Sequence, residues 1–296
     1  MLLARSPWLA ALLVLAACAA PTLEEQAAPV SSVHAIDEAP VVAAPPDAIT
    51  PSMPGLSVSV HTTLGIPEAA SASDPAHALL VKSQYVVSFD STKQNPRWTS
   101  WEVTKKWIGD SGRSSSWVLD TTLPAGMKQA SNADYTSSGF QRGHLCPSAD
   151  RTITVADNKA TFVFTNAVPQ TQQSNIGPWA DAERTERSLA DAGRHVFVIA
   201  GSLHEGEHRT IGDDVWVPSS MWKVIVVMDG ASPKPTEVTA QTRVISIEVP
   251  NTTTATGSYR SYKTTLAELE TKTGMTFLSD VDPAVHAALA TALDPN

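Results

Sequence analysis

Cysteine, long apolar runs and an excess of basic residues are all lacking in this chain of 296 residues. Because it has only two cysteines, Cys18 and Cys146, no framework of disulfides can hold the fold together. Its main apolar run, residues 8–20, is shorter than the roughly 20 residues that a membrane-spanning helix needs. The formal net charge of −9 argues against tight, salt-resistant binding of nucleic acid over the whole surface.

The acidic charge is concentrated in one stretch. Residues 19–77 contain seven acidic residues, no Lys or Arg, and nine of the 21 prolines. Such a composition predicts a disordered, extended tether. Residues 78–296 carry 20 basic and 23 acidic residues and are long enough for one packed domain. We therefore expect a signal peptide at 1–17, a tether at 18–77 and a catalytic or binding domain at 78–296.

The N-terminal apolar run ends in Leu15-Ala16-Ala17-Cys18, which resembles a bacterial lipobox. The resemblance implies that Cys18 is lipid-modified and becomes the mature N-terminus, anchored stably by several acyl chains. The expected location is then the bacterial cell envelope, with Ala19 favouring the outer membrane and the domain periplasmic or surface-exposed. The alternative is an ordinary signal peptide in which Cys18 is incidental.

The pattern of apolar residues in the domain predicts an α+β fold. Alternating or continuous apolar runs predict strands at 84–90, 97–105, 161–166, 195–201, 221–228 and 244–249, with a turn at Asn95-Pro96. Capping residues and acidic first turns predict helices at 148–160, 178–192, 266–273 and 283–293. Short helices and hairpin-like strands favour a mostly antiparallel central sheet flanked by helices over repeated βαβ units.

Three segments carry side chains suited to phosphodiester chemistry. Arg142-Gly143-His144 puts a guanidinium, which can bind phosphate, two residues from an imidazole, which can deprotonate water. Downstream, an Asn, an acid and an Arg follow each other at intervals of eight and four residues, a spacing that returns to one helix face: Asn175, Glu183 and Arg187. Between them, the segment 165–170 contains Asn166 and Gln170.

Together these segments resemble the active-site signature of the DNA/RNA non-specific endonucleases, the ββα-metal nucleases that include endonuclease G, over about residues 80–285. The resemblance implies the ββα-metal fold, DNA and RNA as substrates and products with 5′-phosphates. It implies that Asn175 is the one direct protein ligand of a metal ion. Mg²⁺ is the expected ion, with Mn²⁺ as a substitute, because Mg²⁺ takes oxygen ligands and keeps several waters.

The resemblance also assigns roles to the other residues. His144 would be the general base, and Glu183 would hold waters of the metal. Phosphate would be bound by Arg142, Arg187 and a further upstream arginine, best matched by Arg113 with Trp117 and Asp120. Asn166 and Gln170 would support the site, although either could instead cap a strand end.

Gln141 is the one departure from the family signature, which has Asp at this position. Gln can still form hydrogen bonds but carries no charge, so we expect it to lie behind the reacting groups and to leave His144 with a lower pKa than an Asp would. A non-catalytic, nucleic-acid-binding lipoprotein with the same fold is the alternative that this departure and the missing basic patch favour.

Two further patterns suggest other chemistry. His204-Glu205-Gly206-Glu207-His208 matches the H-E-x-x-H pattern of zinc metallopeptidases, which requires both histidines on one helix face. Because Gly206 interrupts it and a predicted strand precedes it, we expect a surface loop. Cys146, close to His144, could be a thiol nucleophile, but we expect a small buried apolar residue.

Overall fold

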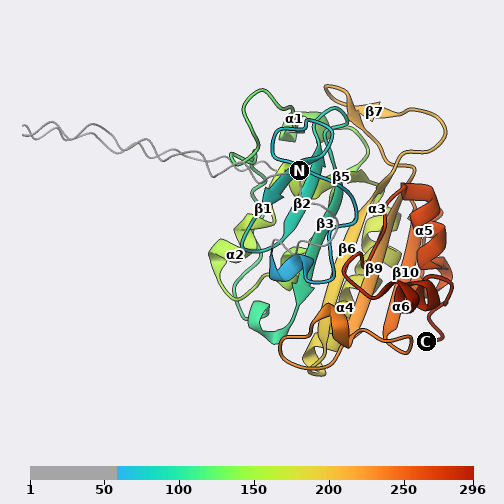
Figure 1. Cartoon of the computed structure of the whole chain (residues 1–296). Coiled ribbons are helices and arrows are strands. Elements are labelled where there is room, and N and C mark those ends of the chain that lie inside the picture. The colour runs from blue at the N-terminus through green and yellow to red at the C-terminus, as the bar shows by residue number, and fades with distance from the viewer. Residues whose placement is uncertain (1–58) are drawn as a thin grey trace, which may run out of the picture. The chain divides into compact units, whose positions relative to one another are not determined.

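A seven-stranded sheet organises residues 59–296, the part of the chain that the computed structural model describes (Figure 1). Its order is β1–β2–β3–β6–β9–β10–β11, and every neighbouring pair is antiparallel. The strands span β1 Ala78–Val81, β2 Val86–Asp90, β3 Asn95–Val103, β6 His195–Leu203, β9 Ser220–Met228, β10 Arg243–Pro250 and β11 Lys263–Thr264. The predicted signal peptide, most of the predicted tether and Cys18 lie outside the described residues.

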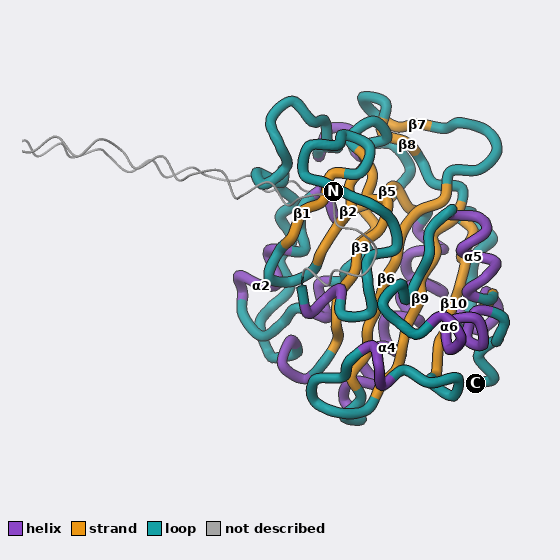
Figure 2. Tube along the Cα trace, in the orientation of Figure 1, coloured by secondary structure: helices purple, strands orange, loops and turns teal. Residues whose placement is uncertain are grey.

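Within residues 59–296, two small two-stranded sheets and six helices surround this sheet (Figure 2). The small sheets pair β4 Gln141–His144 with β5 Ala167–Gln170, and β7 Thr210–Ile211 with β8 Val215–Trp216, both antiparallel. The helices are α1 Asn132–Tyr135, α2 Val155–Ala160, α3 Gln172–Ser174, α4 Ala180–Asp191, α5 Leu266–Thr273 and α6 Pro283–Ala290. Among residues 59–296, no helix combines the length and apolar character needed to cross a bilayer.

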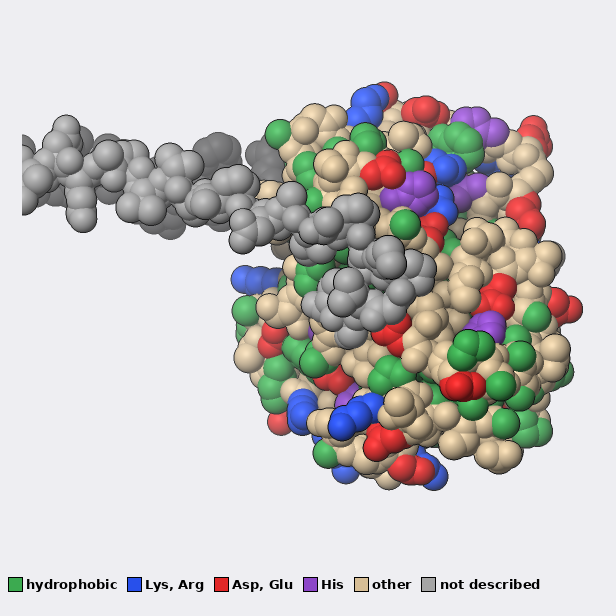
Figure 3. Space-filling view, viewed as in Figure 1, with side chains coloured by type: hydrophobic (Ala, Val, Ile, Leu, Met, Phe, Trp, Pro, Cys, Tyr) green, Lys and Arg blue, Asp and Glu red, His purple; other side chains and the backbone are tan. Residues whose placement is uncertain are grey.

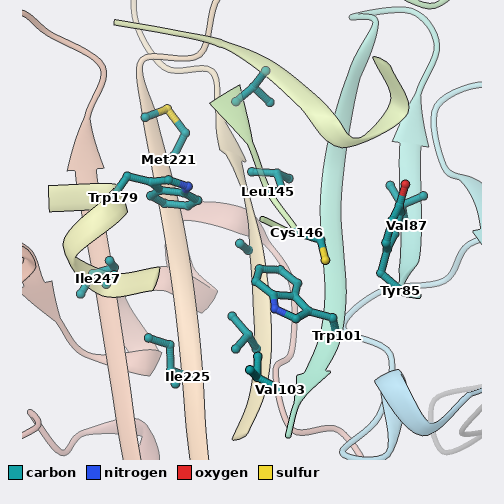
Figure 4. Packing of buried hydrophobic residues seen from close by; sticks show 14 of the residues in the cluster. Tyr85, Val87, Trp101, Val103, Leu145, Cys146, Trp179, Met221, Ile225 and Ile247 are labelled. Atoms are coloured by element: carbon teal, nitrogen blue, oxygen red, sulfur yellow. The ribbon is translucent and has the colours of Figure 1, made fainter. Parts of the chain in front are cut away.

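The sheet has a hydrophobic core on each face because its strand side chains alternate. In β9, Met221 and Ile225 belong to one core, whereas Trp222 and Val224 belong to the other. The first core also contains Trp101 and Trp179, and Figure 4 shows their indole rings lying over the strands together with Cys146 and Leu145. The second core is covered by α5, α6 and residues 64–70. The first face carries the predicted site.

Helix α5 illustrates how local sequence determines an element. Thr265 and Glu268 form a capping box, in which each side chain accepts a hydrogen bond from the backbone N–H of the other. Gly274 ends the helix in the left-handed conformation at φ 70°, which a residue without a Cβ adopts at little cost. The observed bounds, Leu266–Thr273, are those that the sequence predicts.

Most of the predicted elements are confirmed, and with them the α+β class. The strands expected at 195–201, 221–228 and 244–249 are β6, β9 and β10, and the helix expected at 178–192 is α4. The helix expected at 148–160 is two shorter pieces, a 3₁₀ turn at Ser148–Asp150 and α2.

Two local predictions are wrong. The strand expected at 161–166 ends in a 3₁₀ turn, Phe164–Asn166, because the Asn166 side chain donates to the backbone oxygens of Cys146 and Thr161 and draws the chain inward. The turn expected at Asn95-Pro96 lies earlier. Both residues are already in β3, and Pro96 sits next to a β-bulge, where the missing N–H is tolerated.

The folded part of the chain also begins earlier than residue 78. Within residues 59–77, a 3₁₀ turn at Val60–Thr62 buries His61, and Leu64 and Ile66 pack into the second core. The His61 ring is bonded on both sides, because Nδ1 accepts from the Glu102 N–H at 3.2 Å and Nε2 contacts the Ser83 oxygen at 2.8 Å. Residues 59–77 therefore belong to the folded domain, although the proline-rich composition of 19–77 predicted a tether there.

Candidate active site

A pocket opens where β4, the segment 147–149, the turn Asn175–Trp179 and the start of α4 meet. Five of the predicted site residues line it: Arg113, Arg142, His144, Asn175 and Glu183. Pro147, Ser148, Ala149, Ile176 and Ala180 complete the lining. Side chains from positions as far apart as 113 and 183 thus converge at one place, as the sequence predicted.

The antiparallel pair β4–β5 determines where the Arg-Gly-His segment points. Gln141 lies opposite Gln170, and His144 lies opposite Ala167. A Cβ at Gly143 would meet Oε1 of the buried Gln170 at 2.1 Å and its Cβ at 2.8 Å, so only glycine fits between Arg142 and His144. Gln170 therefore has a packing role beneath the motif.

Asn166 and Trp179 hold the backbone around His144. Asn166 accepts from the Cys146 N–H at 2.9 Å and donates to the Cys146 oxygen at 2.8 Å. The Trp179 indole donates to the His144 oxygen at 3.1 Å. Both side chains are buried, so the segment that carries His144 is fixed from two sides. Asn166 is thus a support of the site.

The His144 ring is packed between aromatic side chains. Its centroid lies 4.5 Å from that of Trp117 and 4.7 Å from that of Phe162. Burial first, and the Arg113 guanidinium second, lower the pKa of His144 to about 3. Within residues 59–296, Nε2 of His144 has no hydrogen-bond partner although it is buried, which is rare for a structural histidine. The ring is therefore neutral and has a nitrogen to offer.

Two arginines face the pocket without a carboxylate partner among the described residues. Arg113 donates to the Ser148 hydroxyl and lies over the Phe162 ring, 5.1 Å from its centroid. Arg142 donates to Oδ1 of Asn132 at 3.2 Å and lies 5.9 Å from the centroid of Tyr135. Neutral partners leave both guanidinium charges available to an anion.

Asn175 lies at a kink, where α3 passes into a π-helical turn, Asn175–Trp179, and then into α4. Gly177 and Pro178 cause the kink, since Gly177 has non-helical backbone angles (φ −89°, ψ −111°). The Asn175 Nδ2 donates to Oε1 of Gln141 at 2.7 Å. With Nδ2 engaged, Oδ1 is the amide atom left for a cation.

This contact revises the role of Gln141. We expected its missing charge to act on His144, but the side chain is bonded to Asn175, and the lowered pKa of His144 comes from burial and Arg113. The position that departs from the family signature thus still supplies a hydrogen-bond acceptor to the predicted metal ligand.

Glu183 and Arg187, four residues apart on α4, have different surroundings. Glu183 lines the pocket, and burial raises its pKa to about 7, with Lys223 opposing the rise. Arg187 is not among the pocket-lining residues. Its Nη1 lies 2.9 Å from Oδ1 of the fully buried Asp150. Asp150 thus partly neutralises the Arg187 charge, and the expected role of Arg187 in binding phosphate stays a prediction.

A second buried ion pair lies below the pocket. Lys223 and Glu186 are 2.7 Å apart and wholly inaccessible. The Lys223 ammonium lies 4.4 Å from the Trp179 ring centroid and 5.4 Å from that of Trp101. Sequence patterns gave no signal for this pair or for the Asp150 partner of Arg187, because each joins residues 37 positions apart.

The donor set of the pocket suits a hard divalent cation. Asn175 and Glu183 offer an amide oxygen and a carboxylate, and Mg²⁺ accepts few protein oxygens because it keeps most of its waters. Across residues 59–296, no three His, Cys, Asp or Glu side chains are grouped so that they could hold a metal. Zinc, which usually takes three or four such ligands, does not fit.

The two competing patterns do not form sites in the described part of the chain. Residues 204–209 form a loop between β6 and β7, in which His204 and His208 both pack on the Trp216 ring. The expected surface loop is confirmed, and the helix that a metallopeptidase needs is missing. Cys146 is buried in the first core, where burial raises the pKa of its thiol, so it is a core residue and no nucleophile.

The comparison with known families agrees with this geometry. A model of the family described as DNA/RNA non-specific endonuclease matches residues 68–284. The chain belongs to this family. The match covers β4, α4 and every predicted residue of the pocket.

Similar proteins of this endonuclease family include a nuclease of Nostoc sp. (strain PCC 7120), 37% identical over 240 residues, which cover 80% of this chain and 87% of the relative. Mouse mitochondrial nuclease EXOG is 31% identical over 214 residues, 68% of this chain, but only 56% of its own length is covered. A solved structure, the complex of EndoG with EndoGI, aligns with a TM-score of 0.64 at 20% identity and covers 76% of this chain and 92% of that chain.

These findings confirm the ββα-metal nuclease fold and the enzyme class. The protein is a nuclease, a hydrolase of phosphodiester bonds, and nucleic acids are its substrates. Membership of a family of nucleases favours the enzyme over the non-catalytic alternative.

Proposed function

We propose that this nuclease hydrolyses DNA and RNA without sugar specificity, with Mg²⁺ as its ion and His144 as its general base. One observation carries the proposal. The unpartnered Nε2 belongs to a neutral imidazole that lines the same pocket as two arginines without carboxylate partners and the predicted metal ligand Asn175.

Substrate binding falls to Arg113 and Arg142. A phosphate between them would receive charge-assisted hydrogen bonds, and the same donors would stabilise the negative charge that develops on its oxygens. Arg187 instead neutralises Asp150 below the pocket and so limits the repulsion between Asp150 and Glu183.

Proton removal falls to His144. Trp117 and Phe162 fix the ring, and burial keeps it unprotonated over the physiological pH range. Its Nε2 would accept a proton from a water positioned next to the phosphate. The attack on phosphorus breaks the bond to the 3′-oxygen, so the products carry 5′-phosphates and 3′-hydroxyls.

Asn175 and Glu183 would hold the divalent cation, Asn175 through Oδ1 and Glu183 through the waters of the ion. When bound, the cation neutralises charge on the phosphate and supplies a water that protonates the departing oxygen. Mn²⁺ would substitute because it favours the same carboxylate, carbonyl and water ligands.

The experiment that tests this proposal incubates the purified full chain with supercoiled plasmid DNA and with RNA, in Mg²⁺ or in EDTA. We expect both substrates to be cut in Mg²⁺, neither in EDTA, and the fragments to be end-labelled by a kinase only after phosphatase treatment. Cleavage in EDTA, cleavage of only one of the two nucleic acids, or fragments with free 5′-hydroxyls would contradict the proposal.

We also propose that the nuclease is a lipoprotein of the cell envelope, anchored through Cys18. The lipobox-like Leu15-Ala16-Ala17-Cys18 supports this. Expression with a radiolabelled fatty acid should label the wild-type protein and leave Cys18→Ala unlabelled. Equal labelling of both, or of neither, would contradict the anchor.

A further inference from the structure

Charge pairing differs among the arginines of residues 59–296. Five of the ten lie within 4.0 Å of a carboxylate: Arg97, Arg184, Arg187, Arg194 and Arg243. On the part of the surface visible in Figure 3, Lys and Arg side chains are likewise interspersed with Asp and Glu. The other five have no carboxylate of residues 59–296 within 4.0 Å, and the two pocket arginines, Arg113 and Arg142, are among them.

Arg209 is such an arginine, and the ring beneath it belongs to Phe140, two residues before the pocket-lining Arg142. It follows the loop that leaves β6, and its backbone oxygen accepts from the Val217 N–H at 2.8 Å. Its guanidinium lies over the Phe140 ring, 5.4 Å from the centroid. Stacking on a ring orders the side chain and leaves its N–H groups directed outward to an anion.

Phe140 connects Arg209 to Arg142. Phe140 directly precedes β4, and Arg142 is the second residue of that strand. Two residues apart along the chain, their Cα atoms are at most about 7 Å from each other. Tyr135, the ring beneath Arg142, belongs to a small hydrophobic cluster, and Phe140, the ring beneath Arg209, packs against the same cluster.

Two cations held over neighbouring positions of one segment can contact the same nucleic-acid strand. Phosphates of one strand follow each other about every 3.4 Å along the axis of a duplex, so several of them lie near any phosphate that Arg142 binds. Phosphate contacts position a strand but carry no sequence information, which suits a non-specific nuclease.

We propose that Arg209, seated on Phe140, binds a backbone phosphate that neighbours the bond that is cleaved. The proposal rests on the proposed function, since it takes the pocket as the place of cleavage. Glu205 and Glu207 share the loop, and neither lies within 4.0 Å of a basic group of residues 59–296, so the contribution of Arg209 is that of one partly screened contact.

The test measures binding of a fluorescent 12-nucleotide single-stranded DNA by anisotropy, with the full chain carrying His144→Ala so that the DNA stays intact. Adding Arg209→Ala should weaken binding about three- to tenfold and reduce the slope of log K against log salt by about 0.7. Arg209→Lys should keep most of the salt slope because it keeps the charge. Lys234→Ala, an exposed cation beyond the far end of β9, is the matched control and should change neither quantity.

Binding by Arg209→Ala that equals the Lys234→Ala control would overturn the subsite. The proposed function fails separately, if the wild-type chain cuts neither DNA nor RNA. Because anisotropy measures binding without cleavage, it gives the contribution of Arg209 to DNA affinity whether or not the wild-type chain cuts nucleic acid.

Discussion

His144 and His204 occupy similar local environments in two different regions of the molecule. Each ring packs against a tryptophan, Trp117 for His144 and Trp216 for His204, and each has a lowered pKa, about 3 and about 4, caused first by burial. Among the described residues, Nε2 of each lacks a hydrogen-bond partner. By these measures alone, either histidine would qualify as a neutral base.

The surroundings separate them. The pocket of His144 also contains Asn175, Glu183 and two arginines without carboxylate partners. The cleft beside His204 contains Lys93 and Arg97, but each is paired, with Asp90 and Glu68 respectively. A perturbed imidazole therefore indicates a catalytic centre only where ligands for the substrate and the cation face it as well.

The largest effect is expected from removing the predicted metal ligand. Asn175→Ala should lower the rate of plasmid cleavage about 10³-fold, because several kcal/mol of charge stabilisation at the phosphate are lost with the ion. His208→Ala, in the H-E-x-x-H loop, is the matched change and should keep its rate within about twofold. Comparable losses in both variants, in proteins with wild-type circular dichroism, would show that the two regions do not differ as described.

An intermediate effect is expected at Gln141, which orients Asn175. Gln141→Met keeps the length but removes the acceptor, so the affinity for Mg²⁺ should fall about 10- to 100-fold. Gln141→Glu keeps the length of the side chain and can still accept the hydrogen bond from Asn175. Because the carboxylate also adds a negative charge near the ion, Mg²⁺ should bind more tightly than in the wild type. Titration calorimetry gives these affinities without turnover. An unchanged affinity in Gln141→Met would mean that the contact with Asn175 has no effect on the ion.

The smallest effect concerns stability against acid. His144 stays neutral in the fold, whereas an unfolded histidine takes up a proton below about pH 6.5. The unfolded state thus binds more protons, and the free energy of unfolding should fall by about 1.4 kcal/mol per pH unit between about pH 6 and 4 through this residue. Glu183 has the opposite effect on the free energy of unfolding. Its pKa is raised to about 7 in the fold, so the folded state binds more protons, and this residue lowers the stability as the pH rises from about 4.5 to 7.

Urea unfolding at several pH values checks this comparison. In His144→Ala, the slope of the free energy of unfolding against pH should be smaller than in the wild type by nearly the amount that one bound proton contributes, about 1.4 kcal/mol per pH unit. His204→Ala should lose less, because His204 is partly exposed and solvent screens its charge. The same pH dependence in the wild type and in His144→Ala would contradict the neutral buried imidazole.

Local signals explain why much of this fold was predictable from sequence. Apolar β-branched runs predict β6, β9 and β10, and a capping box with a terminal glycine predicts α5. The pocket residues were predictable from order and spacing, because Asn175 and Glu183 follow the Arg-Gly-His segment at the distances typical of the family.

Contacts between distant residues explain what was not predictable. The strand expected at 161–166 was lost to hydrogen bonds that Asn166 forms with Cys146, 20 residues away. The pairing of Arg187 with Asp150 was not predicted from sequence, and neither was the burial of His61 in a proline-rich stretch. Each outcome depends on a partner that only the folded chain brings near.

The most direct test of the account compares His144→Ala with His204→Ala in steady-state cleavage of plasmid DNA at saturating Mg²⁺. A general base contributes about 10²- to 10⁴-fold, so His144→Ala should lose activity by a factor in this range, while His204→Ala keeps the wild-type rate. Wild-type cleavage by His144→Ala, or an equal loss in both variants, would contradict the assignment of the catalytic centre to the pocket around His144.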